Sequence, residues 1–508
     1  MNCKLTRNYI VWTNFPFETS FSPCYTTTLL DLQYIMFIST QVARATLRVL
    51  LRQSANTCSQ RFASTSKNSL PVVSAGSGET SHLLQTCAKK KSDPLEYENL
   101  LQASLGSHVK NSQIVQKLIC QDGMVDVTWK DDCTSRYHSK WLWFNCFCSE
   151  CMQPNSGQKI VKPGNIPWKL TAVNAKEFEN DDGAFIEVQF KEVNHIVRLP
   201  QEWLKLYSYS TDSLQAKSEL KDPPYFTQGP IKAFDYQAVS DTESNHYFEW
   251  LHNLNLSGVT VVTNVPTETG ASGKVGELIG PVTTTLYGKV SDVVAVENPI
   301  NVAYSSISLD VHQDLMYYES PPGLQLLHCL RFCPQVTGGE SLFIDAFYAA
   351  ENFRQEHPHH FQTLLKVPAT FKKIHFDRDN PAAYLYQRPH ITVNSHQKIT
   401  NVIWSPPFEG PLQVSEELVE PYFEAYQAFA ETIHKAPVVT HRMVPGDCLV
   451  FNNRRMLHGR NSYELNGGAR HFQVCYVNTD DFIQRVQVEH IRRKTGQFAK
   501  RVGNQCNF

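Results

Sequence analysis

The sequence predicts a mostly β protein with some α-helix: a β-barrel or jelly-roll core decorated by helices, after a small α+β domain. Two observations favour this class. From about residue 240 onward the signals are mostly short strands with only a few helices. These strands do not alternate regularly with helices, so parallel βαβ units are not expected. The chain has 508 residues, which is enough for two or three domains with sizeable cores.

The expected elements fall into two regions. In the first, from about 115 to 210, strands are predicted at Met124–Trp129, Ala184–Phe190 and His195–Leu199. In the second, strands are predicted at Gly258–Val265, Val293–Val296, Gly323–Phe332, Ser341–Asp345 and Asp447–Phe451, and helices at Phe347–His357, Glu416–His434 and Asp480–Lys494. A charged, Pro-containing stretch at 217–230 separates two predicted domains, residues 115–216 and 235–500.

Residues 1–95 predict an N-terminal extension that ends in a polar linker. From Gln33 to Gly78 there is no Asp or Glu, while Arg, Lys, Ser, Thr and Ala are frequent. This composition is typical of a mitochondrial transit peptide, which places the protein in the matrix. The alternative is a disordered tail on a cytoplasmic protein. Met36 lies near the start of this segment and before its first Arg, so it stays open whether residues 1–35 are translated.

Charge and hydropathy exclude several classes of partner. The formal net charge of −2 gives no electrostatic reason to expect nucleic acid or an anionic membrane surface as a partner. No window of about 18 uncharged apolar residues occurs, so no transmembrane helix is expected. The 14 cysteines are scattered apart from one cluster, which predicts thiols and metal ligands and not a disulfide framework.

The triplet His312-Gln313-Asp314 is the first candidate for catalysis. It follows a strand-like run, Ser305–Val311, and residues two apart on a strand point to the same face. An imidazole and a carboxylate would then converge, and His458, after a later predicted strand, would supply a third ligand. Two histidines and one carboxylate form the facial triad of Fe(II) oxygenases, which leaves positions open for oxygen and an oxo-acid.

A second triplet of the same type, His375-Phe376-Asp377, competes with the first. The first is preferred because a Pro-Pro-Gly turn, a long apolar strand and then Thr337-Gly338-Gly339 follow it. The second lies in a charged, Pro-flanked segment that predicts a solvated loop.

Arg470 follows His458 by twelve residues and suggests the co-substrate. A 2-oxoglutarate molecule bound to iron through its 2-oxo acid end leaves a distal carboxylate. The fork of an arginine side chain binds a carboxylate through two hydrogen bonds. The hydroxyl of Thr337 would add a donor.

These residues resemble a known family. The segments that carry the resemblance are His312-Gln313-Asp314, Pro321 to Cys329, Thr337-Gly338-Gly339 and Met456-Leu457-His458-Gly459-Arg460. They are similar to the gamma-butyrobetaine and trimethyllysine dioxygenases, which belong to the taurine-dioxygenase-like oxygenases. The resemblance covers roughly residues 118–495. It implies a double-stranded β-helix core, Fe(II), 2-oxoglutarate and O2 as reactants, ascorbate as a helper reductant, and a homodimer.

The cysteine cluster also matches this family. Cys146, Cys148 and Cys151, with His195 as the fourth ligand, would form a closed tetrahedral site for structural zinc. From the spacing alone, three buried thiols without a metal are the alternative.

The resemblance further implies a trimethylammonium substrate. Such a group cannot donate a hydrogen bond and is recognised by aromatic faces. Tyr287, Tyr304 and Tyr476 align with tyrosines of the family's aromatic cage, and Asn301 aligns with a residue that contacts the substrate carboxylate. The chain departs from the family at Ser291, where the cage has a tryptophan. It departs again at Leu315, where the family has a tyrosine, and at Trp404, which stands in a stretch that carries an Asn in the family.

Three functions follow from these residues. The first is hydroxylation of gamma-butyrobetaine to L-carnitine, with release of succinate and CO2. The second is hydroxylation of trimethyllysine, which the transit-like segment and Tyr317-Tyr318 favour and Asn301 disfavours. The third is a non-enzymatic, zinc-stabilised binding protein on an inactive scaffold, against which the intact His312, Asp314 and His458 argue.

Overall fold

The computed structural model describes residues 114–495, except 154–155, 181–182, 220–223, 295–303 and 377–380, together with residues 497 and 499. The predicted N-terminal extension, Asn301 and Asp377 therefore lie outside the described residues. Within them, no helix has both the length and the apolar character that crossing a bilayer requires.

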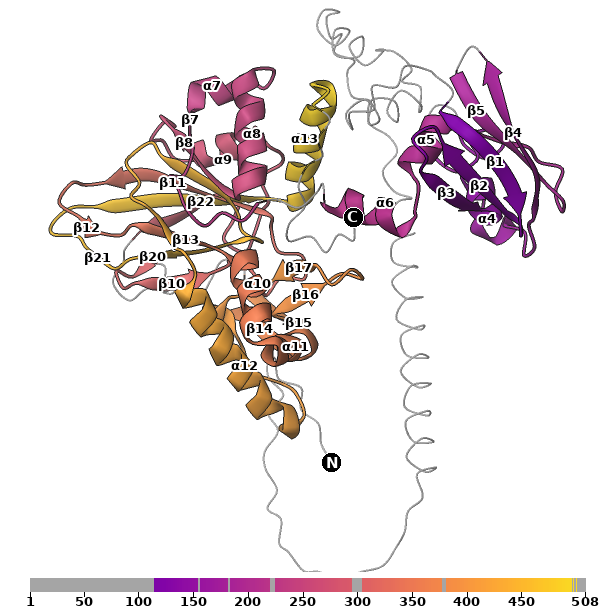
Figure 1. Ribbon diagram of the computed structural model, residues 1–508. Helices are drawn as coiled ribbons and strands as arrows, with labels where there is room; N and C mark the ends of the chain where they lie inside the picture. Colours follow the sequence, from indigo (N-terminus) through magenta and orange to yellow (C-terminus); the bar gives the residue numbers. More distant parts are fainter. Residues whose placement is uncertain are drawn as a thin grey trace, which may run out of the picture. The chain divides into compact units, whose positions relative to one another are not determined.

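Residues 114–219 contain two antiparallel sheets of three strands each, shown in indigo and purple in Figure 1. The first contains β1 (Val115–Gln121), β2 (Met124–Trp129) and β3 (Thr134–His138), and the second contains β4 (Ala172–Asn180), β5 (Gly183–Phe190) and β6 (Val197–Pro200). The helices are α4 (Ser139–Phe144), α5 (Gln201–Leu206), α6 (Thr211–Glu219) and the 3-10 turn η1 (Pro163–Asn165). Alternate residues of β2, among them Val125, Val127 and Trp129, are buried in one core, as expected of a strand with one covered face.

The C-terminal region is built on two larger sheets. The six-stranded sheet has the order β7 (Ala233–Asp235), β8 (Val259–Thr263), β19 (Cys448–Asn452), β11 (Leu324–Phe332), β22 (Arg470–Val477), β9 (Ser291–Val294). The four-stranded sheet has the order β10 (Leu309–His312), β20 (Met456–Arg460), β13 (Ser341–Asp345), β18 (Val439–His441). All neighbouring strands of both sheets are antiparallel except β7 and β8.

Hairpins and helices surround these sheets (Figure 1). The two-stranded ribbons pair β12 (Thr337–Gly338) with β21 (Tyr463–Glu464), β14 (Pro368–His375) with β15 (Ala382–Pro389), and β16 (Ile391–Val393) with β17 (Ile399–Val402). The helices are α7 (Tyr236–Ser240), α8 (Asn245–Ser257), α9 (Ala271–Glu277), α10 (Ala346–Glu356), α11 (Pro358–Lys366), α12 (Glu416–Lys435), α13 (Thr479–Arg492) and the 3-10 turn η3 (Pro406–Phe408).

The central strands of the six-stranded sheet are buried on both faces. In β19, Cys448 and Val450 pack among residues of α8, α9 and α13, while Leu449 and Phe451 pack in a separate core on the other face. Successive side chains of a strand point to opposite faces, so one continuous apolar run serves both cores. The face turned away from these helices is the one available for a site.

The strands and helices predicted for the C-terminal region are confirmed with small changes at the ends, except that the strand-like run Ser305–Val311 is a strand only from Leu309 onward. In the N-terminal region the third predicted strand begins at Val197, so His195 lies in the bend before it. The solvated loop predicted for the second triplet is wrong at His375, which is the last residue of β14. Strand β14 pairs with β15 along eight residues, so His375 is part of a hairpin and not of a loop.

A buried ion pair connects Asp345, the last residue of β13, with Arg455, which lies between β19 and β20. Arg455 Nη2 lies 2.7 Å from Asp345 Oδ2, and the side chains are 1% and 0% exposed. Asp345 also accepts hydrogen bonds from the backbone of Phe226 and Phe347, and Arg455 donates to the carbonyl of Leu256.

The Asp345→Ala variant is expected to lose about 3–5 kcal/mol of free energy of unfolding, because the charge of Arg455 would stay buried without its partner. Denaturant titration measures this loss. The matched control is Glu277→Ala, which breaks the Lys289–Glu277 pair, whose side chains are 55% and 54% exposed. The control should cost less than about 1 kcal/mol. Equal losses in both variants would contradict the assignment of the Asp345 pair as a structural anchor.

Candidate functional site

Two histidines and one aspartate converge between the two sheets. His312 ends β10, His458 lies in the middle of β20, and the two residues are direct partners across the strands. Their ring centroids are 4.6 Å apart. Asp314 Oδ1 lies 3.5 Å from His312 Nε2, and Asp314 Oδ2 lies 3.8 Å from His458 Nε2. One ligand atom from each of the three residues lies within 4.8 Å of the others, which is close enough for all of them to bind one metal ion.

Asp314 reaches this point from a turn, so the expected strand alternation between His312 and Asp314 is wrong. The strand ends at His312, and Asp314 begins a turn in which Leu315 has a φ of 64°. The side-chain amide of Asn453 bonds both the N–H and the carbonyl of Asp314. A left-handed φ at a non-glycine residue costs about 1–3 kcal/mol and persists where the surroundings impose it. The two hydrogen bonds between the Asn453 side chain and the Asp314 backbone are one such constraint.

Gly459, beside His458, lets β10 come close to β20. A Cβ atom at this position would lie 2.7 Å from the carbonyl oxygen of Leu309. Any larger residue would push β10 away and would separate His312 from His458.

Hydrogen bonds and burial prepare the three side chains as ligands. His312 Nδ1 lies 2.8 Å from the carbonyl oxygen of Asp310, so it donates there and leaves Nε2 free to bind a metal. Burial and the nearby His312 lower the pKa of His458 to about 3, which keeps that ring neutral. Burial opposes ionisation of Asp314, yet His312 and His458 hold the pKa of its carboxyl below the usual range.

The metal-ligating cluster lines a cavity of about 440 Å³ between the two sheets. A volume of about 300–1,000 Å³ is usual for small-molecule sites. Strand β22 contributes Arg470, Val474 and Tyr476 to the lining, because residues an even number apart share one face of a strand. One strand thus carries a cation to one part of the cavity and an aromatic ring to another.

Arg470 is a buried cation without an acidic partner. Among the described residues no carboxylate forms an ion pair with it, and its Nε has no hydrogen-bond acceptor. Its guanidinium lies 4.0 Å from the ring centroid of Phe472. Burial and the nearby Arg460 lower the pKa of Arg470 to about 10, so the side chain stays charged at neutral pH. A buried charge of this kind is stabilised by an anionic ligand.

Two further polar residues of the cavity were not predicted as ligands. Ser341 on β13 and Arg460 on β20 are direct register partners, and both line the cavity. Arg460 was noted only as part of a motif, and Ser341 only as the start of a strand. Strand alternation from His458 would have identified Arg460, which lies two residues further along β20.

The three predicted cage tyrosines lie in the same cavity. Tyr287, Tyr304 and Tyr476 all line it, together with Ser291 and with Phe408 of η3. Phe408 was not predicted. The hydroxyls of Tyr287 and Tyr317 are 3.4 Å apart, so Tyr317 supports the lining from behind.

Other predicted positions are not in the cavity. Thr337 is exposed on the short strand β12, where its hydroxyl accepts a hydrogen bond from Asn466 Nδ2 at 3.3 Å. Trp404 is 3% exposed, is stacked on Tyr426 and does not line the cavity. It therefore cannot stand in for the cage tryptophan that the resemblance implies at the position of Ser291. Leu315 is buried in the core beside Asp314.

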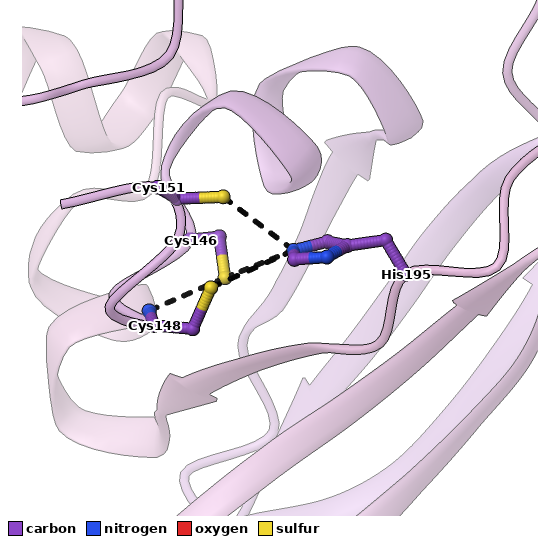
Figure 2. Close-up of side chains that lie close together, drawn as sticks. All are labelled: Cys146, Cys148, Cys151 and His195. Atoms are coloured by element: carbon purple, nitrogen blue, oxygen red, sulfur yellow. Dashed lines mark hydrogen bonds between the residues drawn. The ribbon is translucent and has the colours of Figure 1, made fainter.

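A second cluster lies in the N-terminal region. Figure 2 shows Cys146, Cys148 and Cys151, from the segment after α4, around the imidazole of His195. Their sulfurs lie 3.4, 3.9 and 3.5 Å from His195 Nε2. Tetrahedral zinc with Zn–S of about 2.3 Å and Zn–N of about 2.0 Å requires separations of about 3.6 Å. Burial raises the pKa of Cys146 to about 11, so this thiol is not a reactive thiolate unless a cation is present.

Comparisons with known proteins agree with both regions. The family described as "Taurine catabolism dioxygenase TauD, TfdA family" matches residues 220–476, and "Gamma-butyrobetaine hydroxylase-like, N-terminal" matches residues 117–195.

Relatives with curated names match most of the chain. A gamma-butyrobetaine dioxygenase of Pseudomonas sp. (strain AK-1) is 30% identical and covers 72% of this chain and 93% of its own length. A trimethyllysine dioxygenase of Meyerozyma guilliermondii is 25% identical, covering 73% of this chain and 94% of its own. A mitochondrial trimethyllysine dioxygenase of Bos taurus is 26% identical, covering 70% and 82%.

Proposed function

The chain belongs to the TauD, TfdA family of 2-oxoglutarate-dependent dioxygenases, and from this premise we propose that it hydroxylates gamma-butyrobetaine to L-carnitine. The observation that carries the proposal is a single cavity that holds three kinds of group. It contains a metal-binding triad, a buried arginine that has no acidic partner among the described residues, and a set of aromatic rings. The non-enzymatic alternative gives no account of a complete triad beside this arginine.

We assign the iron to His312, Asp314 and His458. Two neutral imidazoles and one carboxylate are the donor set that suits Fe(II) and leaves positions open for other ligands. When bound, the iron couples O2 to the oxidative decarboxylation of 2-oxoglutarate, which yields succinate and CO2 as a C–H bond is hydroxylated. The protein orients the reactants and excludes water from the cavity.

Arg470 binds the distal carboxylate of 2-oxoglutarate in this proposal. Its charge is buried, and the ligand carboxylate would supply the missing partner through two parallel hydrogen bonds. Ser341 and Arg460 line the same cavity and add donors for the same anion. Thr337, the hydroxyl expected from the sequence, is replaced in this role by Ser341.

The aromatic lining selects the substrate. A trimethylammonium group is attracted to ring faces within about 6 Å of their centroids, by about 0.5–2 kcal/mol for each ring. Tyr287, Tyr304, Tyr476 and Phe408 offer such faces. Phe408 is an additional ring in a chain that has Ser291 at the position where the family resemblance implies a cage tryptophan.

Trimethyllysine is the second candidate substrate, and one observation favours it. Asp310 lines the cavity, and its carboxylate, which lies 3.1 Å from His434 Nε2, is 66% exposed. An amino-acid substrate has a second ammonium group, which such a carboxylate would attract. Trimethyllysine dioxygenases are also among the curated relatives.

Turnover of a substrate panel tests the proposal. The purified chain with Fe(II), 2-oxoglutarate and ascorbate is given gamma-butyrobetaine, trimethyllysine, or the neutral analogue of gamma-butyrobetaine in which carbon replaces the quaternary nitrogen. Mass spectrometry should detect hydroxylated gamma-butyrobetaine and no product from the neutral analogue. Preferred turnover of trimethyllysine would move the assignment to the second candidate. Equal turnover of the charged and neutral compounds would overturn the aromatic-cage argument.

We also propose that Cys146, Cys148, Cys151 and His195 bind structural zinc. Cys146→Ser is expected to reduce the zinc content to background and to make residues 114–210 sensitive to protease, because zinc binding and folding of such sites are linked. Elemental analysis measures the zinc. The control Cys133→Ser changes an exposed cysteine outside the cluster and should keep the metal. Full zinc content in Cys146→Ser would refute the site.

The proposal also covers the domain architecture, the helper reductant, the oligomeric state and the location in the cell. The two large sheets would form a double-stranded β-helix, in a domain spanning about residues 235–500 after a zinc domain at 115–216. Ascorbate as helper reductant and a homodimer follow from the family resemblance. Residence in the mitochondrial matrix is supported by the acid-free segment from Gln33 to Gly78 and by the mitochondrial relative.

A further inference from the structure

One oxygen of the metal-binding carboxylate is held by two side chains. Gln325 Nε2 donates to Asp314 Oδ2 at 2.9 Å, and the hydroxyl of Tyr476 donates to the same oxygen at 3.0 Å. Gln325 on β11 and Tyr476 on β22 are direct partners across the two strands. They are 4% and 3% exposed, and both line the cavity. The other oxygen, Oδ1, is the one nearest His312 Nε2.

We propose that Gln325 and Tyr476 are positioning residues that fix the orientation in which the Asp314 carboxylate would bind the metal, and that Tyr476 links the substrate-binding ring to that carboxylate. The inference rests on the proposed iron site. Two donors hold Oδ2 in place, while Oδ1 lies 3.5 Å from His312 Nε2 and Oδ2 lies 3.8 Å from His458 Nε2, so the carboxylate is fixed beside both histidines. A hydrogen bond to a charged acceptor is roughly twice as strong as one between neutral groups, and here both bonds are shielded from water.

The orientation of the Gln325 amide supports this role. Its Oε1 is buried and has no hydrogen-bond partner among the described residues. A buried polar atom without a partner costs about 1–3 kcal/mol, so the side chain must gain elsewhere. Turning the amide over would place Oε1 against the carboxylate, which is repulsive. The bond from Nε2 to Asp314 is the contact that fixes the observed orientation.

Tyr476 joins two parts of the site. Its ring lines the cavity among the proposed cage residues, and its hydroxyl holds the metal-binding carboxylate. A substrate cation packed on this ring therefore touches a side chain that also sets the geometry at the metal. Removing the hydroxyl alone separates the two roles, because phenylalanine keeps the ring.

Metal affinity tests the inference without turnover. Co(II) binding to the iron-free protein, with the Cys146 cluster kept occupied by zinc, is titrated calorimetrically for Tyr476→Phe, Gln325→Met and the double variant. Each single variant should bind Co(II) about 10- to 100-fold more weakly, the usual effect of losing an outer-shell partner. The matched control is Tyr247→Phe, which removes a buried tyrosine hydroxyl that donates to the carbonyl of Leu278 outside the cavity and should keep the wild-type affinity.

A second measurement separates a positioning role from a general loss of packing. In Tyr476→Phe loaded with a saturating metal ion, binding of gamma-butyrobetaine should be unchanged, whereas Tyr476→Ala should weaken it. Wild-type metal affinity in both Tyr476→Phe and Gln325→Met would overturn the inference while leaving the iron site in place. Failure of the wild-type chain to bind Co(II), or binding that survives His458→Ala, would overturn the proposed iron site itself.

Discussion

Replacing His458 with alanine is expected to remove metal binding and 2-oxoglutarate turnover together. The loss of an outer-shell partner alone costs about 10- to 100-fold, so the loss of a direct ligand should reduce activity more than about 100-fold. Only three protein ligands meet at this site, and no other histidine of the described residues belongs to the cluster. Metal titration and succinate release measure the two losses.

His375 supplies the matched control for that variant. It belongs to the second His-x-Asp triplet and ends β14, outside the metal-binding cluster. His375→Ala should therefore bind metal and release succinate as the wild-type chain does. Activity that survives in His458→Ala, or that disappears in His375→Ala, contradicts the choice between the two triplets.

Replacing Arg470 with alanine is expected to raise the KM for 2-oxoglutarate. Truncation of one partner of a buried, hydrogen-bonded charge pair costs about 2–5 kcal/mol, a factor of roughly 30 to several thousand in affinity. Arg470→Lys should recover part of this, because lysine keeps the charge but loses the fork. Steady-state kinetics with 2-oxoglutarate varied at saturating substrate measure the effect.

Arg331 provides the control for Arg470. It is an exposed arginine on β11, and Arg331→Ala should leave the KM for 2-oxoglutarate unchanged. A KM in Arg470→Ala within the range of Arg331→Ala would exclude Arg470 from the binding of the co-substrate and would point to Arg460 in its place.

The sequence predicted those parts of the fold whose apolar pattern is continuous. Strand Ser341–Asp345 was predicted with its observed ends, and Asp447–Phe451 within one residue. Strands β20 and β22 were not predicted, although they carry His458, Arg470 and Tyr476. The cavity-facing positions His458 and Arg460 of β20 and Arg470 of β22 are polar or charged because they form the site, and they interrupt the usual apolar signal of a strand.

Site residues were predictable where a motif marks them, and less so where position depends on tertiary contacts. The convergence of His312, Asp314 and His458 was predicted from the motif, although Asp314 reaches the site from a turn and not by strand alternation. The exposure of Thr337 did not, because it depends on β12 pairing with β21 far along the chain. The second role of Tyr476, as a donor to Asp314, depends on the register between β11 and β22, which no local pattern reveals.

The most direct test of the proposed function is turnover with gamma-butyrobetaine under ¹⁸O2. A 2-oxoglutarate-dependent hydroxylation sends one oxygen atom of O2 to succinate and the other to the product. The proposal predicts labelled succinate and labelled L-carnitine in equal amounts, with both absent in His458→Ala. Labelled succinate without any hydroxylated trimethylammonium compound, or L-carnitine whose new oxygen comes from water, would contradict it.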